Sequence, residues 1–225
     1  MIKLIAITAL LFQMKACSTQ QPGKEVQNPI PTMENKEVLS EEKINPSGLD
    51  TIILAAGCFW CVEAVFQDLK GVYQVKSGYT GGKTKNPDYH EVCGGMTGHA
   101  EALEVLFDPK IISLEQLLEV FWSTHDPTTL NRQGADKGTQ YRSAIFYQNE
   151  EQKAVAMKSK AEVATKFWDD PIVTEITKAD IFYPAEDYHQ NYFNENGNSN
   201  PYCSIVVRPK VEKFEKVFKN KLKKD

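Results

Sequence analysis

The fold of this chain is decided around residues 51–63, which read Thr51-Ile52-Ile53-Leu54-Ala55-Ala56-Gly57-Cys58-Phe59-Trp60-Cys61-Val62-Glu63. Residues 51–56 are short, apolar and partly β-branched, which predicts a buried strand. Apolar side chains then recur at helical spacing up to Leu69, which predicts a helix over 59–69. The glycine between the two patterns indicates a tight turn.

Cys58 lies at the N-terminus of this predicted helix. Unsatisfied backbone amides and the positive end of the helix dipole favour an anion there, so we expect the pKa of the Cys58 thiol to be lowered. A thiolate is the nucleophilic form of cysteine. Phe59 and Trp60 follow directly and would supply an apolar wall beside the sulfur.

Length and charge limit the possible classes of function. The chain has 225 residues and a net charge of −4, and its basic residues are dispersed until the lysine-rich C-terminal end. The sequence lacks the clustered basic residues with which proteins bind the phosphates of a nucleic-acid backbone, so we expect no nucleic-acid partner. Residues 49–225 are long enough for one domain with a sizeable core.

The N-terminus carries an export pattern, with Lys3 before the apolar run 4–12. This run is too short to span a bilayer but fits the core of a signal peptide. Residues 1–17 resemble a lipoprotein signal ending at Cys17, which would be lipidated, and residues 18–48 are a polar linker. We therefore expect a lipid-anchored protein of the cell envelope. Ordinary secretion and an uncleaved apolar N-terminus are the alternatives.

Further elements follow from periodicity along residues 72–222. A glycine-rich loop is expected over 78–82, and Ser113 with Gln116 forms a capping-box pattern. Strands are predicted over 72–79, 101–107, 143–147 and 204–207, extended segments over 172–176 and 179–183, and helices over 113–123, 150–167 and 211–222. Because strands and helices mix without strict alternation, the pattern favours an α+β layer fold.

The cysteines point to redox chemistry. They are Cys17, Cys58, Cys61, Cys93 and Cys203. A structural disulfide framework and a zinc site are the rival interpretations. A domain of this size does not need the first, and the second would need four ligands where only one C-x-x-C pair exists. A C-x-x-C pair at the start of a helix after a strand favours redox work.

Three more segments make the interpretation specific. They are Gly98-His99-Ala100-Glu101, Gln133-Gly134-Ala135-Asp136-Lys137-Gly138-Thr139-Gln140-Tyr141-Arg142-Ser143 and Tyr183-Pro184-Ala185-Glu186-Asp187-Tyr188-His189-Gln190. Together with residues 57–60, they resemble the peptide methionine sulfoxide reductase A family over about residues 51–217. The resemblance implies a ferredoxin-like two-layer α+β sandwich, with a mixed sheet flanked by helices. It also implies reduction of the S epimer of methionine sulfoxide, without cofactor or metal.

The resemblance assigns roles to individual residues. Cys58 would attack the sulfoxide sulfur, and Glu101 would protonate the oxygen, which otherwise leaves poorly. Tyr89 and Tyr141 would hydrogen-bond that oxygen, and Asp136 would help organise the site. Without the resemblance, Glu101 would be interpreted as a solvated edge carboxylate and the tyrosines as half-buried aromatics.

Phe59 and Trp60 match the family's pocket for the substrate methyl group, although aromatics at a helix start are more often core residues. The oxidised Cys58 would be a sulfenic acid, which a second thiol condenses into a disulfide. Cys61 is preferred for this step because it lies one helical turn away. Cys203, at the start of a predicted strand, and Cys93 are the alternatives.

The remaining polar residues of the motifs receive structural interpretations. His99 and His189 are predicted to be structural hydrogen-bonding residues, and Glu186 and Asp187 to accept bonds from backbone donors. The resemblance implies oxidised proteins as substrates and thioredoxin, or a thioredoxin-like protein, as reductant. A monomer is the default. The alternative functions are a general thiol-disulfide oxidoreductase and a non-catalytic envelope lipoprotein that binds peptides.

Overall fold

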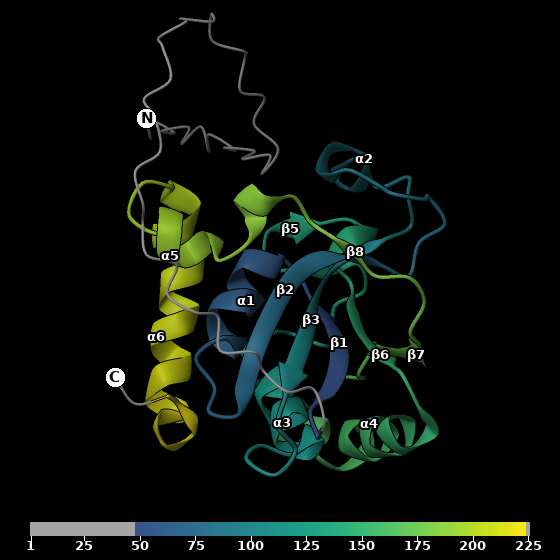
Figure 1. The fold of residues 1–225 in the computed structure, drawn as a ribbon, viewed down its shortest axis with the longest axis vertical. Coiled ribbons are helices and arrows are strands. Elements are labelled where there is room, and N and C mark those ends of the chain that lie inside the picture. The colour runs from purple at the N-terminus through teal and green to yellow at the C-terminus, as the bar shows by residue number, and fades with distance from the viewer. Residues whose placement is uncertain (1–47, 224–225) are drawn as a thin grey trace, which may run out of the picture. The chain divides into compact units, whose positions relative to one another are not determined.

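The structure is a computed structural model of the chain and describes residues 48–223. The strands are β1 Asp50–Ala56, β2 Val72–Thr80, β3 Ala100–Phe107, β4 Arg132–Gln133, β5 Asp136–Lys137, β6 Ser143–Tyr147, β7 Glu175–Lys178 and β8 Tyr183–Pro184. The α-helices are α1 Phe59–Phe66, α2 Tyr89–Cys93, α3 Leu114–Thr124, α4 Glu150–Glu162, α5 Tyr192–Asn196 and α6 Arg208–Val217. Figure 1 shows the sheet at the centre, with α6 on one side and α4 on the other.

The main sheet has the strand order β7-β6-β1-β3-β2-β8. Its inner strands β6-β1-β3-β2 pair antiparallel, with α1 connecting β1 to β2 and α3 connecting β3 to β6. This is the β-α-β-β-α-β arrangement of a ferredoxin-like sandwich, so the predicted fold class is confirmed. The edge strand β7 pairs parallel to β6, which makes the sheet mixed.

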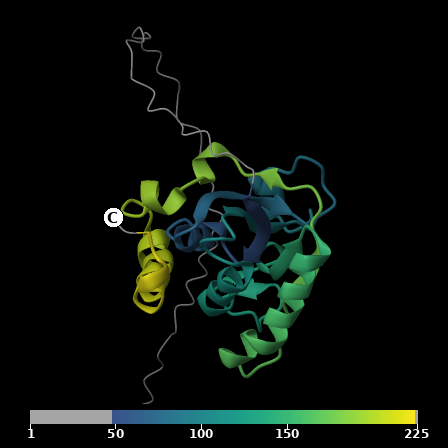
Figure 2. The same cartoon turned by 60° about the horizontal axis from the view of Figure 1, so that its bottom comes forward.

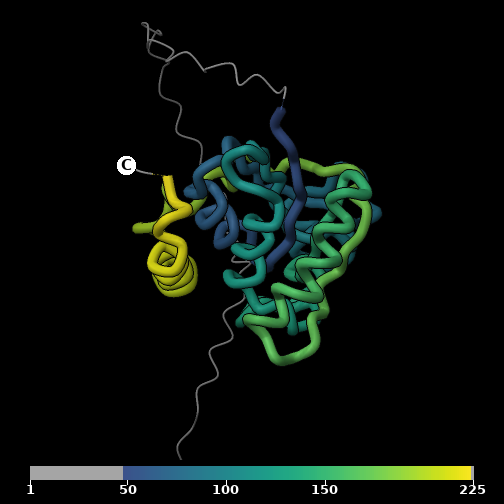
Figure 3. The backbone as a smooth tube through the Cα atoms, turned by 90° about the horizontal axis from the view of Figure 1, so that it is seen from below, coloured from purple at the N-terminus to yellow at the C-terminus, as the bar shows by residue number. Residues whose placement is uncertain are grey.

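The two faces of the sheet carry different layers, because side chains alternate along each strand. Ile52 and Leu54 belong to the large core that packs on α1, α3 and α4, whereas Ile53 and Ala55 face Phe182 and its neighbours. Figure 2 shows α3 (teal) beside α4 (green), and Figure 3 shows α6 (yellow) separated from α4 by α1 and α3. The helical layer therefore covers one face of the sheet.

Most predicted elements are present with small shifts of their ends. Strands β1, β2, β3 and β6 and the capping box of Ser113 with Gln116 are confirmed. Helix α1 ends at Phe66 rather than residue 69, and α4 ends at Glu162, before a short 3-10 turn. The glycine-rich loop begins only at Gly81, because residues 78–80 still belong to β2.

The predictions for residues 172–222 need larger corrections. The predicted strand over 204–207 is wrong, because Cys203–Val207 form a π-helical turn that leads into α6. The expected extended segments reduce to the short strands β7 and β8, and the last helix begins at Arg208 and ends at Val217. Cys203, Val207 and Val211 are buried at four-residue spacing, which is the spacing of one helical face. Burial of this face favours a helix more than the β-branched residues of 204–207 favour a strand.

The predicted signal sequence, the linker and Cys17 lie outside the described residues. Within residues 48–223, none of the helices has the length and apolar character needed to cross a membrane.

Candidate active site

The turn between β1 and α1 sets the position of Cys58. Gly57 has φ of +88°, and a Cβ atom there would lie 2.6 Å from the side chain of Gln133, so only glycine fits without strain. Cys58 is then the N-cap residue of α1, with 8 % of its surface exposed. The predicted strand-turn-helix setting of this cysteine is confirmed.

Glu101 belongs to β3, and its side chain reaches the first residue of α1. It lies on the same face of the sheet as Leu103 and Val105. Its Oε2 atom accepts a hydrogen bond of 3.0 Å from the backbone N–H of Phe59, and only 2 % of its surface is exposed. Burial raises the pKa of its carboxyl to about 8, against the opposing effect of that hydrogen bond. Glu101 is therefore mostly protonated at neutral pH and can donate a proton.

Tyr141 and Asp136 lie on the segment that follows β4. Tyr141 is buried and shares a cluster with Cys58, and burial raises the pKa of its hydroxyl, which stays protonated. Asp136 is half-buried and accepts a hydrogen bond of 2.7 Å from the hydroxyl of Tyr202. The structure thus brings together residues from the start of α1, from β3, from β5 and the 3-10 turn after it, and from the segment before α6.

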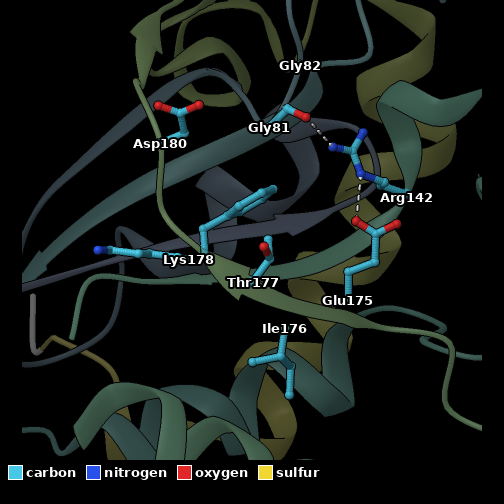
Figure 4. A pocket seen from close by; sticks show the side chains of 9 residues that line it. Gly81, Gly82, Arg142, Glu175, Ile176, Thr177, Lys178 and Asp180 are labelled. Carbon is cyan, nitrogen blue, oxygen red and sulfur yellow. Dashed lines mark hydrogen bonds and ion pairs between the residues drawn. The ribbon is translucent and has the colours of Figure 1, made fainter. Parts of the chain in front are cut away.

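Arg142 anchors the segment that carries Tyr141. Its guanidinium donates to the carbonyl oxygen of Thr139 at 3.0 Å and pairs with Glu175 of β7 at 3.2 Å. Figure 4 shows this side chain between Gly81 and Glu175, at a pocket of about 580 Å³. None of the residues that line this pocket is a cysteine, so the pocket lies outside the thiol site.

An aromatic group lies at the first turn of α1. The ring of Trp60 stacks on Tyr192 with 3.8 Å between centroids, and its indole N–H donates to Nδ1 of His189 at 3.1 Å. Phe59 is only 1 % exposed and packs on Tyr79 and His189. Trp60 is the more accessible part of the predicted wall, and Phe59 supports it from behind.

Tyr89 is the first residue of α2 and is half-buried. Its backbone N–H donates to Glu186 at 2.9 Å, and its ring lies 4.4 Å from that of His189. Glu186 also accepts a bond of 3.0 Å from the hydroxyl of Tyr79. The predicted role of Glu186 as an acceptor for backbone donors is confirmed.

The two histidines of the motifs have structural partners, as predicted. His99 accepts a bond from the backbone N–H of Gly82 at 3.1 Å, and its other ring nitrogen lies 2.7 Å from the carbonyl oxygen of Thr84. His189 accepts the Trp60 bond, and burial lowers the pKa of its ring to about 4. His189 is therefore neutral at physiological pH and holds the indole in place.

The expectation of a lowered thiol pKa at Cys58 is wrong for the resting site. Burial raises the pKa of the Cys58 thiol well above its ordinary value, and its neighbour Cys61 and the carboxyl groups of Glu101 and Asp136 raise it further. Removal from water and nearby negative charge both disfavour a thiolate, and here they outweigh the helix terminus. Cys58 therefore rests as a thiol.

Cys61 has the more acidic thiol of the pair. It is buried in the first turn of α1, and its pKa is lowered to about 7. The hydrogen bond with Cys58 is the main cause, and Lys210 and Tyr202 add to it against the effect of burial. The Nζ atom of Lys210 lies 3.7 Å from the Cys61 sulfur.

The other two cysteines have different surroundings. Cys203 is fully buried in one cluster with Cys58 and Cys61, and burial raises the pKa of its thiol. It lies in the π-helical turn, which corrects its predicted position at a strand start. Cys93 ends α2 and is half-buried.

Three residues of the site escaped the analysis of the sequence, namely Tyr192, Tyr202 and Lys210. Glu63 positions the first, because its carboxylate accepts the backbone N–H groups of Asn191 at 2.8 Å and Tyr192 at 3.1 Å. Lys210 carried a signal that was missed, since it follows Cys203 and Val207 on one face of a helix. A lysine on a buried face is unusual and indicates a partner.

The described residues contain no group of three or more histidine, cysteine, aspartate or glutamate side chains that could hold a metal ion.

Comparison with known proteins places this chain in a family. The sequence profile of the family described as peptide methionine sulfoxide reductase matches residues 50–222. Peptide methionine sulfoxide reductase MsrA 1 of Rhodopirellula baltica is 54 % identical over 183 residues, which cover 81 % of this chain and 94 % of that protein. The MsrA protein of Deinococcus radiodurans is 55 % identical and covers 76 % of this chain and 83 % of its own length.

Solved structures agree with these relatives. The reduced form of Mxr1 from Saccharomyces cerevisiae is similar with a TM-score of 0.65 and 39 % identity, covering 70 % of this chain and 91 % of that chain. Methionine sulfoxide reductase A of Corynebacterium diphtheriae is similar with a TM-score of 0.61 and 35 % identity, covering 69 % and 79 %.

Proposed function

This chain belongs to the peptide methionine sulfoxide reductase family, and we propose that Cys58 is the nucleophile with which it reduces methionine sulfoxide. The reaction is the reduction of the S epimer of methionine sulfoxide in proteins to methionine. The two alternative functions are not favoured, because the family match extends over residues 50–222 rather than over the C-x-x-C pair alone.

One observation carries the assignment of the nucleophile and the acid. The carboxyl of Glu101 accepts the backbone N–H of Phe59, the residue next to Cys58, and burial raises its pKa to about 8. A protonated acid and a thiol are thus held together in a site with little water. A soft sulfur nucleophile attacks a sulfoxide only as the oxygen receives a proton, so this pairing fits the reaction.

The first step balances without a cofactor. The Cys58 sulfur bonds to the sulfoxide sulfur while the proton of Glu101 moves to the oxygen, and the thiol proton replaces the one that Glu101 gave. As the oxygen passes to Cys58, the new sulfur-sulfur bond and the sulfur-oxygen bond of the substrate both break. The products are methionine and a Cys58 sulfenic acid, so the substrate sulfur is reduced and the Cys58 sulfur oxidised.

The surrounding residues would orient the substrate. The hydroxyls of Tyr141 and Tyr89 donate to the sulfoxide oxygen, which stabilises charge as the bond order changes. Asp136 organises the site through the hydroxyl of Tyr202. The aromatic group of Trp60, supported by Phe59, takes the methyl group, and only one epimer then places oxygen and methyl in their own subsites.

Cys61 is the proposed resolving thiol. It lies three residues after Cys58, in the same buried cluster, and the charge of Lys210 lowers the pKa of its thiol, whereas burial raises that of Cys203. The resulting disulfide needs an external dithiol, for which we propose thioredoxin or a thioredoxin-like protein. Cys203 has a raised thiol pKa and would react more slowly.

The S and R epimers of dabsyl-methionine sulfoxide test this function directly. With dithiothreitol as reductant, we expect turnover of the S epimer only, and loss of that turnover in Cys58→Ser. Reduction of the S epimer by Cys58→Ser at the wild-type rate would remove Cys58 as the nucleophile.

We also propose that the protein is anchored in the cell envelope through Cys17, on the basis of the apolar run and the cysteine in the first 17 residues. Labelling of cells with a palmitate analogue should mark the protein but not Cys17→Ala. Label that persists in Cys17→Ala would contradict the anchor.

A further inference from the structure

A lysine of the C-terminal helix reaches the resolving thiol from outside the sequence motifs. Lys210 lies in the first turn of α6, and its Nζ atom is 3.7 Å from the Sγ atom of Cys61, 149 residues away in sequence. The lysine is half-buried, next to the buried Val211. A cation that close to a thiol favours the thiolate form.

The fold holds this contact in place. Helix α6 packs beside α1 (Figure 1). Val207 and Val211 share one buried cluster with Cys58 and Cys61. No ion pair within residues 48–223 joins Lys210 to a carboxylate. The Cys61 sulfur is therefore the acceptor that the structure gives to this ammonium group.

We propose that Lys210 activates Cys61 for the resolving step by stabilising its thiolate as it attacks the Cys58 sulfenic acid. This inference rests on the proposed function, because it concerns the second step of that reaction. Lys210 has no part in the first step, since its nitrogen contacts Cys61 rather than the nucleophile.

The step is balanced in atoms and electrons. The Cys61 thiolate attacks the sulfur of the Cys58 sulfenic acid, a sulfur-sulfur bond forms and the sulfur-oxygen bond breaks. The Cys61 sulfur is oxidised and the Cys58 sulfur is reduced. The hydroxyl of the sulfenic acid leaves as water. Its second proton balances the one that the Cys61 thiol released. Lys210 stays an ammonium ion throughout and gives up no proton.

Of the other titratable groups around Cys61, some raise and some lower the pKa of its thiol. Those that face it from the packed elements are Cys58, Glu101, Asp136, Tyr202, Cys203 and Lys210. Asp136 raises the pKa of the Cys61 thiol, as expected of a negative charge, and the hydroxyl of Tyr202 lowers it. Lys210 is the only cation in this set, so its removal should leave the thiolate without a counter-charge.

A single-turnover experiment separates the two steps. The full chain, free of reductant, is mixed with one equivalent of the S epimer of dabsyl-methionine sulfoxide. Methionine release and the loss of one free thiol report the first step, and the loss of a second free thiol reports the disulfide. The variants are Lys210→Met, Lys210→Arg and the control Lys213→Met, which removes an exposed lysine from the same helix.

We expect Lys210→Met to release the first methionine at the wild-type rate and to form the disulfide more slowly below neutral pH. Each unit by which the thiol pKa rises lowers the thiolate fraction at pH 6 about tenfold but increases nucleophilicity about threefold, so the disulfide should form about threefold more slowly per unit. At pH 9 the Cys61 thiol is mostly ionised in both proteins, so the slowing should be absent and the more basic thiolate of the variant should react up to about threefold faster. Lys210→Arg should restore most of the rate, and Lys213→Met should match the wild type.

Two results would overturn the inference. One is a Lys210→Met disulfide rate equal to wild type at every pH. The other is an equal slowing at pH 6 and pH 9, which a change of packing would cause. Absence of methionine release from the wild type would instead contradict the proposed function, so the two failures are distinguishable. Thermal unfolding of each variant shows whether α6 is still packed.

Discussion

The carboxyl of Glu101 accepts a hydrogen bond of 3.0 Å from the backbone N–H of Phe59, which joins the middle of the sheet to the first turn of α1. The two residues are 42 positions apart, and Cys58 immediately precedes Phe59. The proposed acid is therefore fixed to the backbone beside the proposed nucleophile. Motion of the helix start would move both groups together.

Replacement of Glu101 by glutamine should lower kcat/KM on the S epimer by about a hundredfold or more, the range in which a general acid contributes. The amide oxygen of glutamine can still accept the Phe59 N–H, so the fold should persist. Steady-state kinetics and circular dichroism check both points. A folded Glu101→Gln variant with activity within threefold of wild type would exclude Glu101 as the acid.

The same residue should link stability to pH. Its carboxyl has a pKa of about 8 in the folded protein and an ordinary value near 4.5 when unfolded, so the folded state binds more protons between these values. The free energy of unfolding should therefore fall as pH rises from 4.5 to 8, by at most about 1.4 kcal/mol per pH unit from this group. Urea unfolding of Glu101→Gln should lack this component of the slope. An identical slope in both proteins would contradict the raised pKa.

Gly57→Ala should destabilise the protein and displace Cys58. The positive φ of residue 57 and a Cβ contact of 2.6 Å with Gln133 both oppose a side chain, and we expect a loss of about 1–3 kcal/mol in the free energy of unfolding. Gly134→Ala is a matched control, because Gly134 also has a positive φ of +60° but has open space around its Cβ position. Equal losses in the two variants would show that the contact with Gln133 has no effect.

Tyr202→Phe should loosen the C-terminal segment from the site. It removes the bond of 2.7 Å to Asp136, and loss of a hydrogen bond to a charged acceptor costs about 1.5–3 kcal/mol. We expect the lower end of that range, because Asp136 is half-exposed and regains water. The control Tyr73→Phe removes a hydroxyl from an exposed tyrosine and should change stability by less than about 0.5 kcal/mol. Equal urea midpoints for the two variants would contradict a stabilising bond.

The sequence was sufficient where local patterns and the fold agree. The apolar run of β1, the turn at Gly57 and the helical spacing after it predicted the setting of Cys58. The separated segments around Glu101, Asp136 and Tyr141 indicated a shared site through their resemblance to a known family, although nothing in their spacing shows that they meet. That meeting depends on the antiparallel pairing of β1 with β3 on one side and with β6 on the other.

The sequence was insufficient where a property depends on burial by distant residues. The pKa of the Cys58 thiol is raised because other parts of the chain bury it. The local sequence pattern shows only the helix N-terminus, which would lower that pKa. The prediction of a strand over 204–207 was wrong because four residues are too few to distinguish the two-residue repeat of a strand from the 3.6-residue repeat of a helix. The wider spacing of Cys203, Val207, Val211 and Phe214 follows one helical face. That longer window would also have placed Lys210 beside the core.

The most direct test of the central claim is to map the oxidised sulfur in a Cys61→Ser variant. This variant should release one equivalent of methionine from the S epimer and then stop, with a sulfenic acid on Cys58 that dimedone traps. Peptide mass spectrometry should locate the adduct on Cys58, and Cys58→Ser should give neither methionine nor adduct. An adduct on Cys93 or Cys203, with Cys58 unmodified after one equivalent of methionine, would contradict the account.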